Sequence, residues 1–276
     1  MTALRHVEPC MGTVFSFDLR EPYPSDGALE EVIAWLHWVD ATFSTYRPES
    51  DIGRLARGEV EVGDCAPEVG EILALCDRLT EATDGCFSAY AGGALDPSGV
   101  VKGWAIERAG SMLRAAGSPN HHVNGGGDLQ LSGGPEPGRP WRVGIADPLR
   151  PGTVATVVAG RDLAVATSGT AERGAHILDP RTGRPAAALA AVTVVGPSVT
   201  FADAYATAAF VMGEAARDWI EGLIGYEAYG FGIDGRTWAT TGLRADAPGQ
   251  PSTRSGRSTM STRSAIESAT RCGRKG

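Results

Sequence analysis

The stretch AVTVVGPSVTFADAYATAAFVMG, residues 191–213, holds the two kinds of regular structure on which the fold depends. Its first five residues, AVTVV, are small or β-branched, which is typical of a strand. Gly196 and Pro197 then interrupt the run. From Phe201 to Gly213 almost every residue is apolar, which indicates a buried helix. The stretch therefore predicts a strand followed by an apolar helix.

One acidic residue stands inside this apolar helix. Asp203 and Thr207 are four residues apart, so their side-chain oxygens project from the same helical face. Residues 201–213 contain no cation to neutralise a buried carboxylate, and an unpaired buried charge is costly. A carboxylate and a hydroxyl are suitable ligands for Mg²⁺, and the ligand types admit Mn²⁺ equally. The alternative is that Asp203 only caps the start of the helix.

The order of the other segments predicts an α+β fold. Residues 13–20 alternate as a strand, with Phe15, Phe17 and Leu19 on one side. Amphipathic helices are expected over 29–43, with Asp26 as a cap, and over 68–83 and 101–116. Runs of helices and runs of strands, rather than strict alternation, favour this class over a parallel doubly wound sheet. Later β-like runs are HHV, WRVGIA, TVATVVA, LAVAT, AHIL and AVTVV, and closing strands are expected near 229–233.

Charge divides the chain into a body and a tail. The net charge is −8, but residues 247–276 hold six basic residues and one acidic residue, which leaves −13 on residues 1–246. An acidic body argues against nucleic-acid binding. The tail is rich in Ser, Thr, Arg and Gly and nearly free of large apolar residues. We therefore expect one folded domain over 1–246 and a disordered basic tail over 247–276.

The sequence offers no membrane-spanning run and no disulfide framework. No apolar run approaches the ~20 residues that cross a bilayer, so we expect no membrane insertion. The first residues, MTALRHVEPCMG, have no hydrophobic signal core, which predicts a cytoplasmic protein. The five cysteines show neither CxxC nor metal-ligand spacing and are expected to be reduced thiols.

Lys102 is the only lysine of the expected domain. The chain has two lysines, and Lys275 lies in the tail. Because the chain otherwise uses Arg as its cation, a single Lys suggests a site that needs a compact point charge. Asp96 precedes it by six residues, and residues 97–99 are expected to form a turn with backbone groups free for a ligand. The alternative is a solvated lysine in the first turn of a helix.

His176 is a candidate general base. It ends a β-like run and lies close in sequence to Asp179, and histidine as a residue type, with an unperturbed pKa of ~6.5, suits proton transfer at neutral pH. A single histidine of this kind can equally be structural. The glycine-dense stretch at 124–127 lacks a phosphate-binding spacing, so it indicates either a nucleotide loop or a closely packed backbone. The pair His121 and His122 is expected at the surface.

Taken in order, nine segments resemble the FAD:protein FMN transferase family, also called ApbE-like. They span roughly residues 10–213, and their shared order makes chance similarity an unsatisfactory explanation. The segments are MGTVFSF, FSTYRPESDIGRL, DGCFSA, LDPSGVVKGWAIERA, NGGGDLQLSG, WRVGIADP, ATSG, HILDPRTGRP and VTVVGPSVTFADAYATAAFVMG.

The resemblance implies a fold, a reaction and a set of residues. Family members bind FAD and Mg²⁺, transfer FMN to a threonine of an acceptor protein and release AMP. The implied fold is ApbE-like and T-fold-like, with largely antiparallel sheets flanked by helices around an FAD/Mg cleft. The implied metal ligands are Asp203, Thr207 and a carbonyl near Gly99, and the implied catalytic residues are His176, Lys102 and Asp203. The implied flavin-binding residues are Met11, Tyr46, Phe87, Ser88, Ala89, Asp96, Lys102 and Ile177.

Two departures from the family pattern leave alternatives open. The segment at 85–88 reads Gly-Cys-Phe-Ser, where family members usually have an acid at the last position, and the connection to Asp96 is short. Both changes fall where one edge of the flavin is expected. With water as the acceptor, the same site would make an FAD pyrophosphatase that yields FMN and AMP. Without turnover, it would be a flavin-binding protein.

Overall fold

The structure of the chain, a computed structural model, describes residues 3–170, 174, 176–243 and 245–246, so the tail expected over 247–276 lies outside the described residues. The helices are α1 (Ala28–Phe43), α2 (Asp51–Ala56), α3 (Pro67–Ala82), α4 (Ser98–Ala115), α5 (Val199–Met212) and α6 (Ala216–Glu221), with 3₁₀ turns η1 (Val62–Asp64) and η2 (Gly213–Ala215). The strands are β1 (Leu4–Cys10), β2 (Thr13–Leu19), β3 (His121–Gly125), β4 (Asp128–Ser132), β5 (Trp141–Ala146), β6 (Val154–Gly160), β7 (Ala164–Gly169), β8 (Leu178–Asp179), β9 (Arg184–Pro185), β10 (Leu189–Gly196), β11 (Glu227–Gly232), β12 (Thr237–Ala239) and β13 (Ala245–Asp246).

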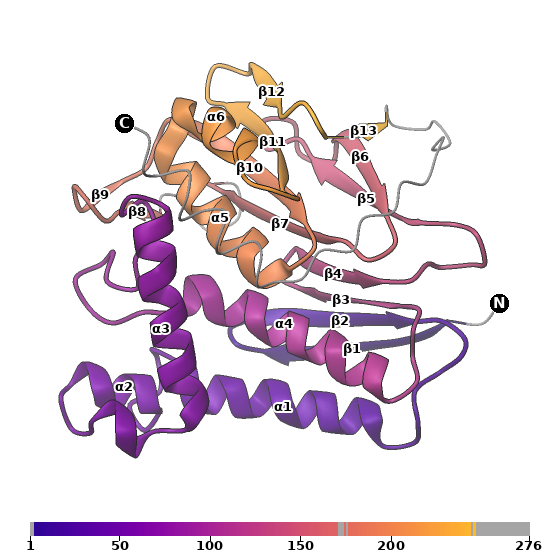
Figure 1. The fold of residues 1–276 in the computed structure, drawn as a ribbon, viewed down its shortest axis with the longest axis horizontal. Coiled ribbons are helices and arrows are strands. Elements are labelled where there is room, and N and C mark those ends of the chain that lie inside the picture. The colour runs from indigo at the N-terminus through magenta and orange to yellow at the C-terminus, as the bar shows by residue number, and fades with distance from the viewer. Residues whose placement is uncertain (1–2, 171–173, 175, 244, 247–276) are drawn as a thin grey trace.

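The strands form one large sheet and two small ones (Figure 1). The large sheet has eight strands in the order β1-β2-β3-β4-β7-β10-β11-β12, and each neighbouring pair in it is antiparallel. Strands β13, β6 and β5 form a second sheet, and β8 and β9 form a separate hairpin. The α+β class with largely antiparallel sheets is therefore confirmed.

Burial explains the two hydrophobic patterns seen in the sequence. All eight residues of β10 are buried, because α5 covers one face of the large sheet and the β5–β6 sheet packs on the other. A strand covered on both faces reads as a continuous apolar run. In β2, Phe15, Phe17 and Leu19 enter the core on the helix side, as their alternation predicted.

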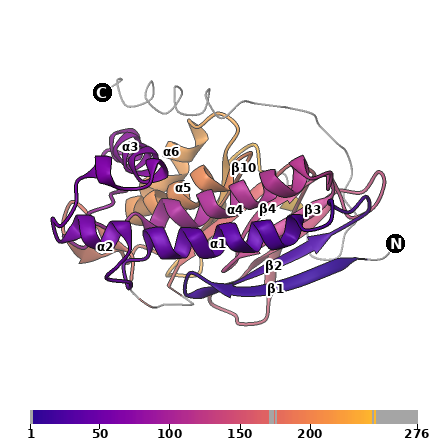
Figure 2. The same ribbon diagram turned by 90° about the horizontal axis from the view of Figure 1, so that it is seen from below.

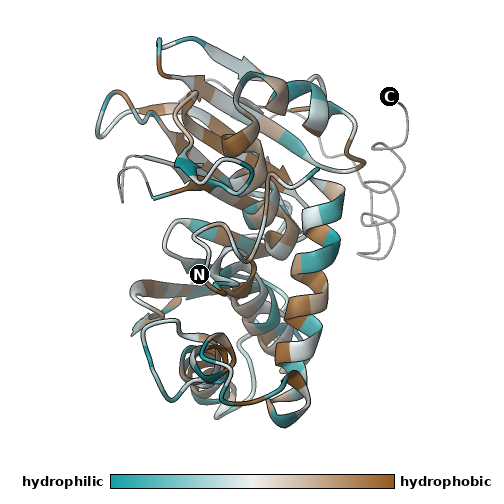
Figure 3. Ribbon diagram, turned by 90° about the vertical axis from the view of Figure 1, so that its left-hand side faces the viewer, coloured by the Kyte–Doolittle hydropathy of each residue, from teal (hydrophilic) through white to brown (hydrophobic). Residues whose placement is uncertain are grey.

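The helices α1, α4 and α5 form a layer on one face of the large sheet (Figure 2). Helix α4 is the middle one, and it contacts α1, α5, β3 and β4. Helix α3 lies outside this layer and buries Val69, Ile72, Cys76 and Leu79, while its remaining residues are partly or fully exposed (Figure 3). Among the described residues, no helix combines the length and the apolar composition that crossing a membrane requires.

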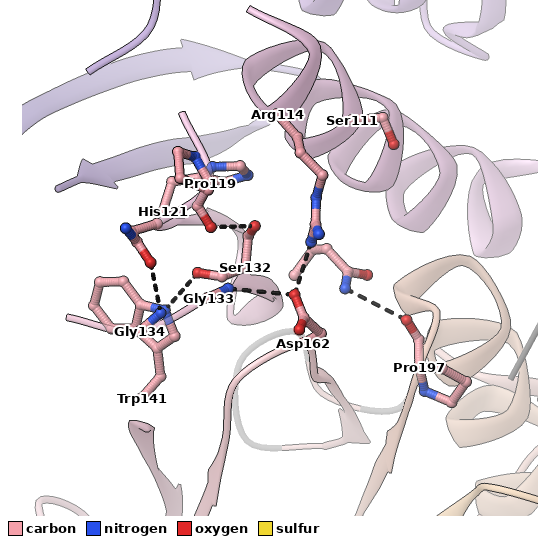
Figure 4. Close-up of polar contacts among 12 residues, drawn as sticks. Ser111, Arg114, Pro119, His121, Ser132, Gly133, Gly134, Trp141, Asp162 and Pro197 are labelled. Carbon is pink, nitrogen blue, oxygen red and sulfur yellow. Dashed lines mark hydrogen bonds and ion pairs between the residues drawn. The ribbon is translucent and has the colours of Figure 1, made fainter. Parts of the chain in front are cut away.

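The C-terminal end of α4 is joined to the sheet region by polar contacts (Figure 4). Arg114 Nη2 donates to Asp162 Oδ1 at 2.8 Å, and the same oxygen accepts the N–H of Gly133 at 3.3 Å. The indole of Trp141 donates to the carbonyl of Ser132 at 2.9 Å. His121 lies beside this region and is only 1% exposed. The expectation that it is a surface residue was wrong, because its strand packs directly beneath α4.

Two helix starts differ from the sequence-based expectation. Asp26 does not cap α1, because the capping position is Gly27, with φ of 84°, and no side chain bonds there. The turn expected over 97–99 is instead the start of α4, which begins at Ser98. The helix begins three residues earlier than expected, with Pro97 at the capping position and no side-chain cap; the N–H of Ser98 donates to Asp96 Oδ1 at 3.0 Å.

Two tight turns meet at one edge of the large sheet. Met11 and Gly12 join β1 to β2 with φ of 53° and 68°, and Gly126 and Gly127 join β3 to β4. The turns touch each other, because a Cβ on Gly126 would lie 2.7 Å from Thr13 Oγ1. A side chain is therefore excluded there by both contact and positive φ. Since the strands are antiparallel, β7 also ends at this edge, and β4 begins there.

Candidate functional site

Three charged side chains from distant parts of the chain meet between the helix layer and the large sheet. Lys102 Nζ lies 2.5 Å from Asp128 Oδ2 and 3.6 Å from Asp203 Oδ1. The two carboxylates are 1% and 4% exposed respectively. Lys102 comes from the first turns of α4, Asp128 from the first residue of β4, and Asp203 from α5. One cation is thus shared between two buried anions.

A close helix crossing brings Lys102 and Asp203 together. At Gly103, a Cβ would lie 2.7 Å from the carbonyl oxygen of Val199 and 2.9 Å from Cα of Thr200. Only glycine permits the two backbones to approach in this way. The residue before Gly103 therefore reaches the face of α5 that carries Asp203. This crossing is the local reason for the charged cluster.

Asp203 does not cap α5, so that alternative is excluded. The capping residue is Ser198, whose hydroxyl accepts the N–H of Phe201 at 3.5 Å. The N–H groups of the first two residues are taken by side chains of other elements: Val199 by Gln130 Oε1 at 3.0 Å, and Thr200 by Glu107 Oε2 at 3.1 Å. The helix start is satisfied without Asp203.

The surroundings of Asp203 oppose its ionisation. Burial raises the pKa of this carboxyl from 3.8 to about 7; nearby Lys102 lowers it and nearby Asp128 raises it. Its Oδ2 atom is buried and has no hydrogen-bond partner among the described residues. A buried carboxylate oxygen without a donor is the feature that a bound cation would satisfy.

Neutral oxygen atoms lie close to this carboxylate. Thr207, one helical turn after Asp203, has its Oγ1 3.4 Å from Ser168 Oγ at the end of β7. Among the described residues, no group of three or more His, Cys, Asp or Glu side chains could hold a metal ion. A cation here would therefore rely on hydroxyls and carbonyls besides Asp203. Such an oxygen set fits Mg²⁺, which retains several waters and needs few protein carboxylates.

The expected flavin-binding segment at 87–89 packs against the start of α4. A Cβ on Gly99 would lie 2.9 Å from the ring of Phe87, so the ring rests directly on the helix backbone. The N–H of Asp96 donates to the carbonyl of Ala89 at 2.7 Å and closes the loop between them. Ser88 is partly exposed, and its hydroxyl accepts the N–H of Tyr90 at 3.0 Å. Phe87 and Ala89 are each 3% exposed, so this segment packs on the end of α4 from which Lys102 comes.

The other residues expected to bind the flavin are only partly buried or are exposed. Met11 lies in the β1–β2 turn and packs partly on the core. Ile177 also packs on the core, and its carbonyl accepts the N–H of Ala186 at 2.9 Å. Tyr46 is 94% exposed on the loop between α1 and α2. The structure therefore gives Tyr46 no packed position that would hold its ring.

His176 is exposed, and its imidazole is oriented by its own loop. Its Nδ1 lies 2.9 Å from the carbonyl oxygen of Gly174. A carbonyl only accepts, so Nδ1 carries the hydrogen, and Nε2 holds the lone pair in the neutral ring. Asp179, its neighbour in sequence, is instead bound by Arg181 at 2.9 and 3.0 Å. The pair of His176 and Asp179 is thus not formed.

Sequence reasoning missed Asp128 and Ser168 as members of the cluster. Asp128 directly follows the glycine-dense stretch 124–127, and Ser168 lies within the run ATSG at 166–169. The sequence did contain one signal, because Asp128 directly follows the tight turn at Gly126 and Gly127 and therefore lies at the end of its strand. Their partners, however, come from helices far away in sequence, so no spacing rule could connect them.

Comparison with known proteins shows which family the chain resembles. The ApbE family model matches residues 11–95 and 88–229. The FAD:protein FMN transferase of Rhodobacter capsulatus is 38% identical over 162 residues, which cover 55% of this chain and 30% of that protein. The FAD:protein FMN transferase of Vibrio cholerae is 36% identical over 130 residues, covering 44% of this chain and 39% of that protein. The chain thus spans less than half the length of these two curated relatives.

Solved structures share the fold at low sequence identity. The flavin transferase ApbE from Vibrio cholerae has a TM-score of 0.76 and 22% identity, and the match covers 87% of this chain and 98% of that one. The ApbE protein from Thermotoga maritima has a TM-score of 0.75 and 22% identity, and the match covers 87% of this chain and 97% of that one. At this identity the likeness concerns the fold.

Proposed function

Because this chain belongs to the ApbE family, we propose that it is a Mg²⁺-dependent FAD:protein FMN transferase. The observation that carries the proposal is the buried Asp203 oxygen without a donor, next to Lys102 at the start of α4. The names of the sequence relatives support the choice of reaction. The proposed substrates are FAD and a threonine of an acceptor protein, and the products are the FMN-bearing protein and AMP.

In the proposed reaction one phosphoester bond replaces one pyrophosphate bond. The hydroxyl oxygen of the acceptor threonine bonds to the phosphorus of the FMN half. The bond from that phosphorus to the bridging oxygen breaks, and AMP leaves with the electron pair. A threonine hydroxyl is a weak nucleophile and needs a base. We assign that role to His176, whose Nε2 is the free acceptor of the neutral ring once Nδ1–H is held by Gly174.

The residues of the cluster divide the remaining tasks. Asp203, Thr207 and a carbonyl near Gly99 would hold the divalent cation, which when bound supplies Lewis-acid stabilisation of phosphate oxygens. Lys102 adds a fixed positive charge for the charge that develops on those oxygens. Met11, Tyr46, Ile177 and the segment 87–89 with Asp96 would bind the flavin half. Tyr46, being exposed, would have to order on the ligand.

The proposal is tested by intact-mass spectrometry. The full chain is incubated with FAD, Mg²⁺ and a candidate acceptor domain bearing an exposed threonine, and AMP is measured in the same tube. We expect the acceptor to gain one FMN as AMP appears, the reaction to stop on chelation with EDTA, and added Mg²⁺ to restore it. AMP and free FMN formed at equal rates with and without acceptor would instead indicate a pyrophosphatase. FAD binding without AMP would indicate a flavin-binding protein.

A further inference from the structure

Asp128 is a buried charged residue to which the proposed reaction gives no role. It is 1% exposed and closes the two-residue turn between β3 and β4, where it pairs with Gly125. Its two carboxylate oxygens have different partners. Oδ1 accepts the N–H of Thr167 in β7 at 3.0 Å, and Oδ2 lies 2.5 Å from Lys102 Nζ. One oxygen accepts a hydrogen bond from the sheet, and the other forms the short ion pair with the lysine, although its geometry with its neighbours among the described residues is not that of a hydrogen bond.

The Lys102 ammonium lies closer to Asp128 than to Asp203. Its ammonium is 2.5 Å from Asp128 Oδ2 but 3.6 Å from Asp203 Oδ1. At the longer distance the contact with Asp203 is an ion pair beyond hydrogen-bond range. Asp203 Oδ2 has no donor among the described residues. The lysine is therefore held near Asp203 but does not cap it.

Without the charge of Asp128, Lys102 would no longer be held closer to Asp128 than to Asp203. The Lys102 side chain is 28% exposed, but its ammonium lies against two buried carboxylates, and a buried carboxylate needs a cation because an uncompensated buried charge is strongly destabilising. Asp203 would be the anion that remains in contact with Lys102. The lysine would then move onto Asp203 and occupy the carboxylate that the proposed cation requires. The hydrogen bond to Thr167 needs only a carbonyl-type oxygen, so it does not explain why the residue is an acid rather than an amide.

We propose that Asp128 is a positioning residue that draws Lys102 away from Asp203 and so keeps Asp203 open for a divalent cation. This inference rests on the proposed function, since it assumes that Asp203 is a metal ligand. Asp128 itself is no ligand in it. It acts through the lysine, and the same arrangement leaves the ammonium close enough to face a phosphate group at the metal.

The variant Asp128→Asn isolates this role. The amide keeps the size of the side chain and an oxygen for the Thr167 N–H, and it removes the charge that holds Lys102. The measurement is Mn²⁺ binding to the metal-free protein without FAD, followed by the loss of the free-ion electron paramagnetic resonance signal. We expect binding to weaken about 10–100-fold, the range found when residues that orient metal ligands are changed. Thermal unfolding of the same samples reports whether the fold is kept.

A double-variant comparison separates positioning from a simple effect of charge. In the Lys102→Met background, Asp128→Asn should change Mn²⁺ affinity several-fold less than it does in the wild type, because the lysine is no longer there to move. A loss of equal size in both backgrounds would mean that Asp128 acts by its own charge, and the inference would be wrong. Glu107→Gln is the matched control, since it removes another carboxylate between α4 and α5 and should leave Mn²⁺ binding unchanged.

Further outcomes distinguish this inference from the proposed function. Wild-type binding of Mn²⁺ that Asp128→Asn does not alter would overturn the role of Asp128 and leave the metal site intact. A wild-type protein that binds no Mn²⁺ would remove the metal site and this inference together. If Asp128→Asn does not fold, the single variant Lys102→Met still tests the inference. Its Mn²⁺ affinity should be equal to or tighter than that of the wild type. Weaker Mn²⁺ binding would contradict competition between the lysine and the cation for Asp203.

Discussion

Two acids, Glu107 of α4 and Asp203 of α5, lie between these helices and differ in the hydrogen-bond donors around them. Glu107 of α4 accepts the hydroxyl of Ser198, the N–H of Thr200 at 3.1 Å and the hydroxyl of Thr200 at 2.6 Å. Asp203 of α5 shares one lysine with Asp128, and its Oδ2 has no donor among the described residues. The same helix pair thus contains one acid with several donors on one oxygen and one acid with a buried oxygen that has none among the described residues.

This difference separates a structural contact, at Glu107, from one that we propose to be functional, at Asp203. A carboxylate at a helix start, with several donors, stabilises the fold through hydrogen bonds and the helix dipole. A buried carboxylate with an open oxygen opposes folding, because its ionisation is not compensated. Proteins retain such a destabilising group at sites where a bound ligand supplies the missing partner of the carboxylate. The comparison predicts that removing the two acids should change stability in opposite directions.

The largest effect is expected for Asp203→Asn. Transfer of FMN should fall by about 10²–10³-fold or more, the loss typical of removing one electrostatic group from an active site. Without metal, the variant should be more stable than the wild type at pH 8. The folded-state pKa, about 7, lies above the ordinary value of 3.8, so this group's stability is present below pH 4 and is lost as pH rises through 7.

The measurements are the mass assay and urea unfolding with EDTA at pH 5 and pH 8. Asp203→Asn should lack the part of the decline in unfolding free energy that the wild type shows between these values. A variant less stable than the wild type at pH 8 would break the comparison, since Asp203 would then be a stabilising contact like Glu107.

The contribution of His121, near the C-terminal end of α4, to the unfolding free energy should depend on pH in the opposite direction to that of Asp203. Its Nδ1–H donates to the carbonyl of Ser118 at 2.7 Å, and burial lowers its pKa from 6.5 to about 4. A lowered histidine pKa means that stability is present above pH 6.5 and is lost as pH falls toward 4. The decline should reach about 3 kcal/mol, from 1.36 kcal/mol per pKa unit.

Unfolding free energies of wild type and His121→Gln between pH 7.5 and 4.5 test this. The variant should lose stability at neutral pH but show a shallower decline on acidification. His122, whose pKa is also lowered by burial, accounts for a remaining slope. Equal slopes in the two proteins would show that His121 is already free to ionise in the folded state.

The smallest effect is expected for Glu107→Gln. The amide loses the charge that accepts from Thr200 and Ser198, and a charge-assisted hydrogen bond contributes about 1.5–3 kcal/mol, of which the amide retains part. The unfolding free energy should therefore fall by roughly 1–2 kcal/mol. Transfer measured at 25 °C should stay within a few-fold of wild type, because Glu107 does not contact the Lys102 cluster in the described structure. A loss of transfer as large as that of Asp203→Asn would remove the distinction between the two acids.

Part of the site was predictable because its evidence is local. The spacing of Asp203 and Thr207 on one apolar helix indicated an oxygen site, and the rarity of lysine singled out Lys102. Periodicity also predicted the buried face of β2 and the helices α1 and α3 to within a few residues. The start of α4 was misplaced because the residues expected to form a separate turn, Ser98 and Gly99, instead form the first turn of the helix.

The sequence by itself determined the α+β class and the candidate acid, hydroxyl and lysine, since these follow from residue types and short spacings. Only the tertiary structure decided which anion holds the lysine. Residues 102, 128 and 203 meet because Gly103 lets two helices touch and because β4 pairs with β7 across the sheet. Such pairings depend on contacts between segments far apart in the chain, and no local pattern encodes the distances of 2.5 and 3.6 Å that divide Lys102 between its two acids.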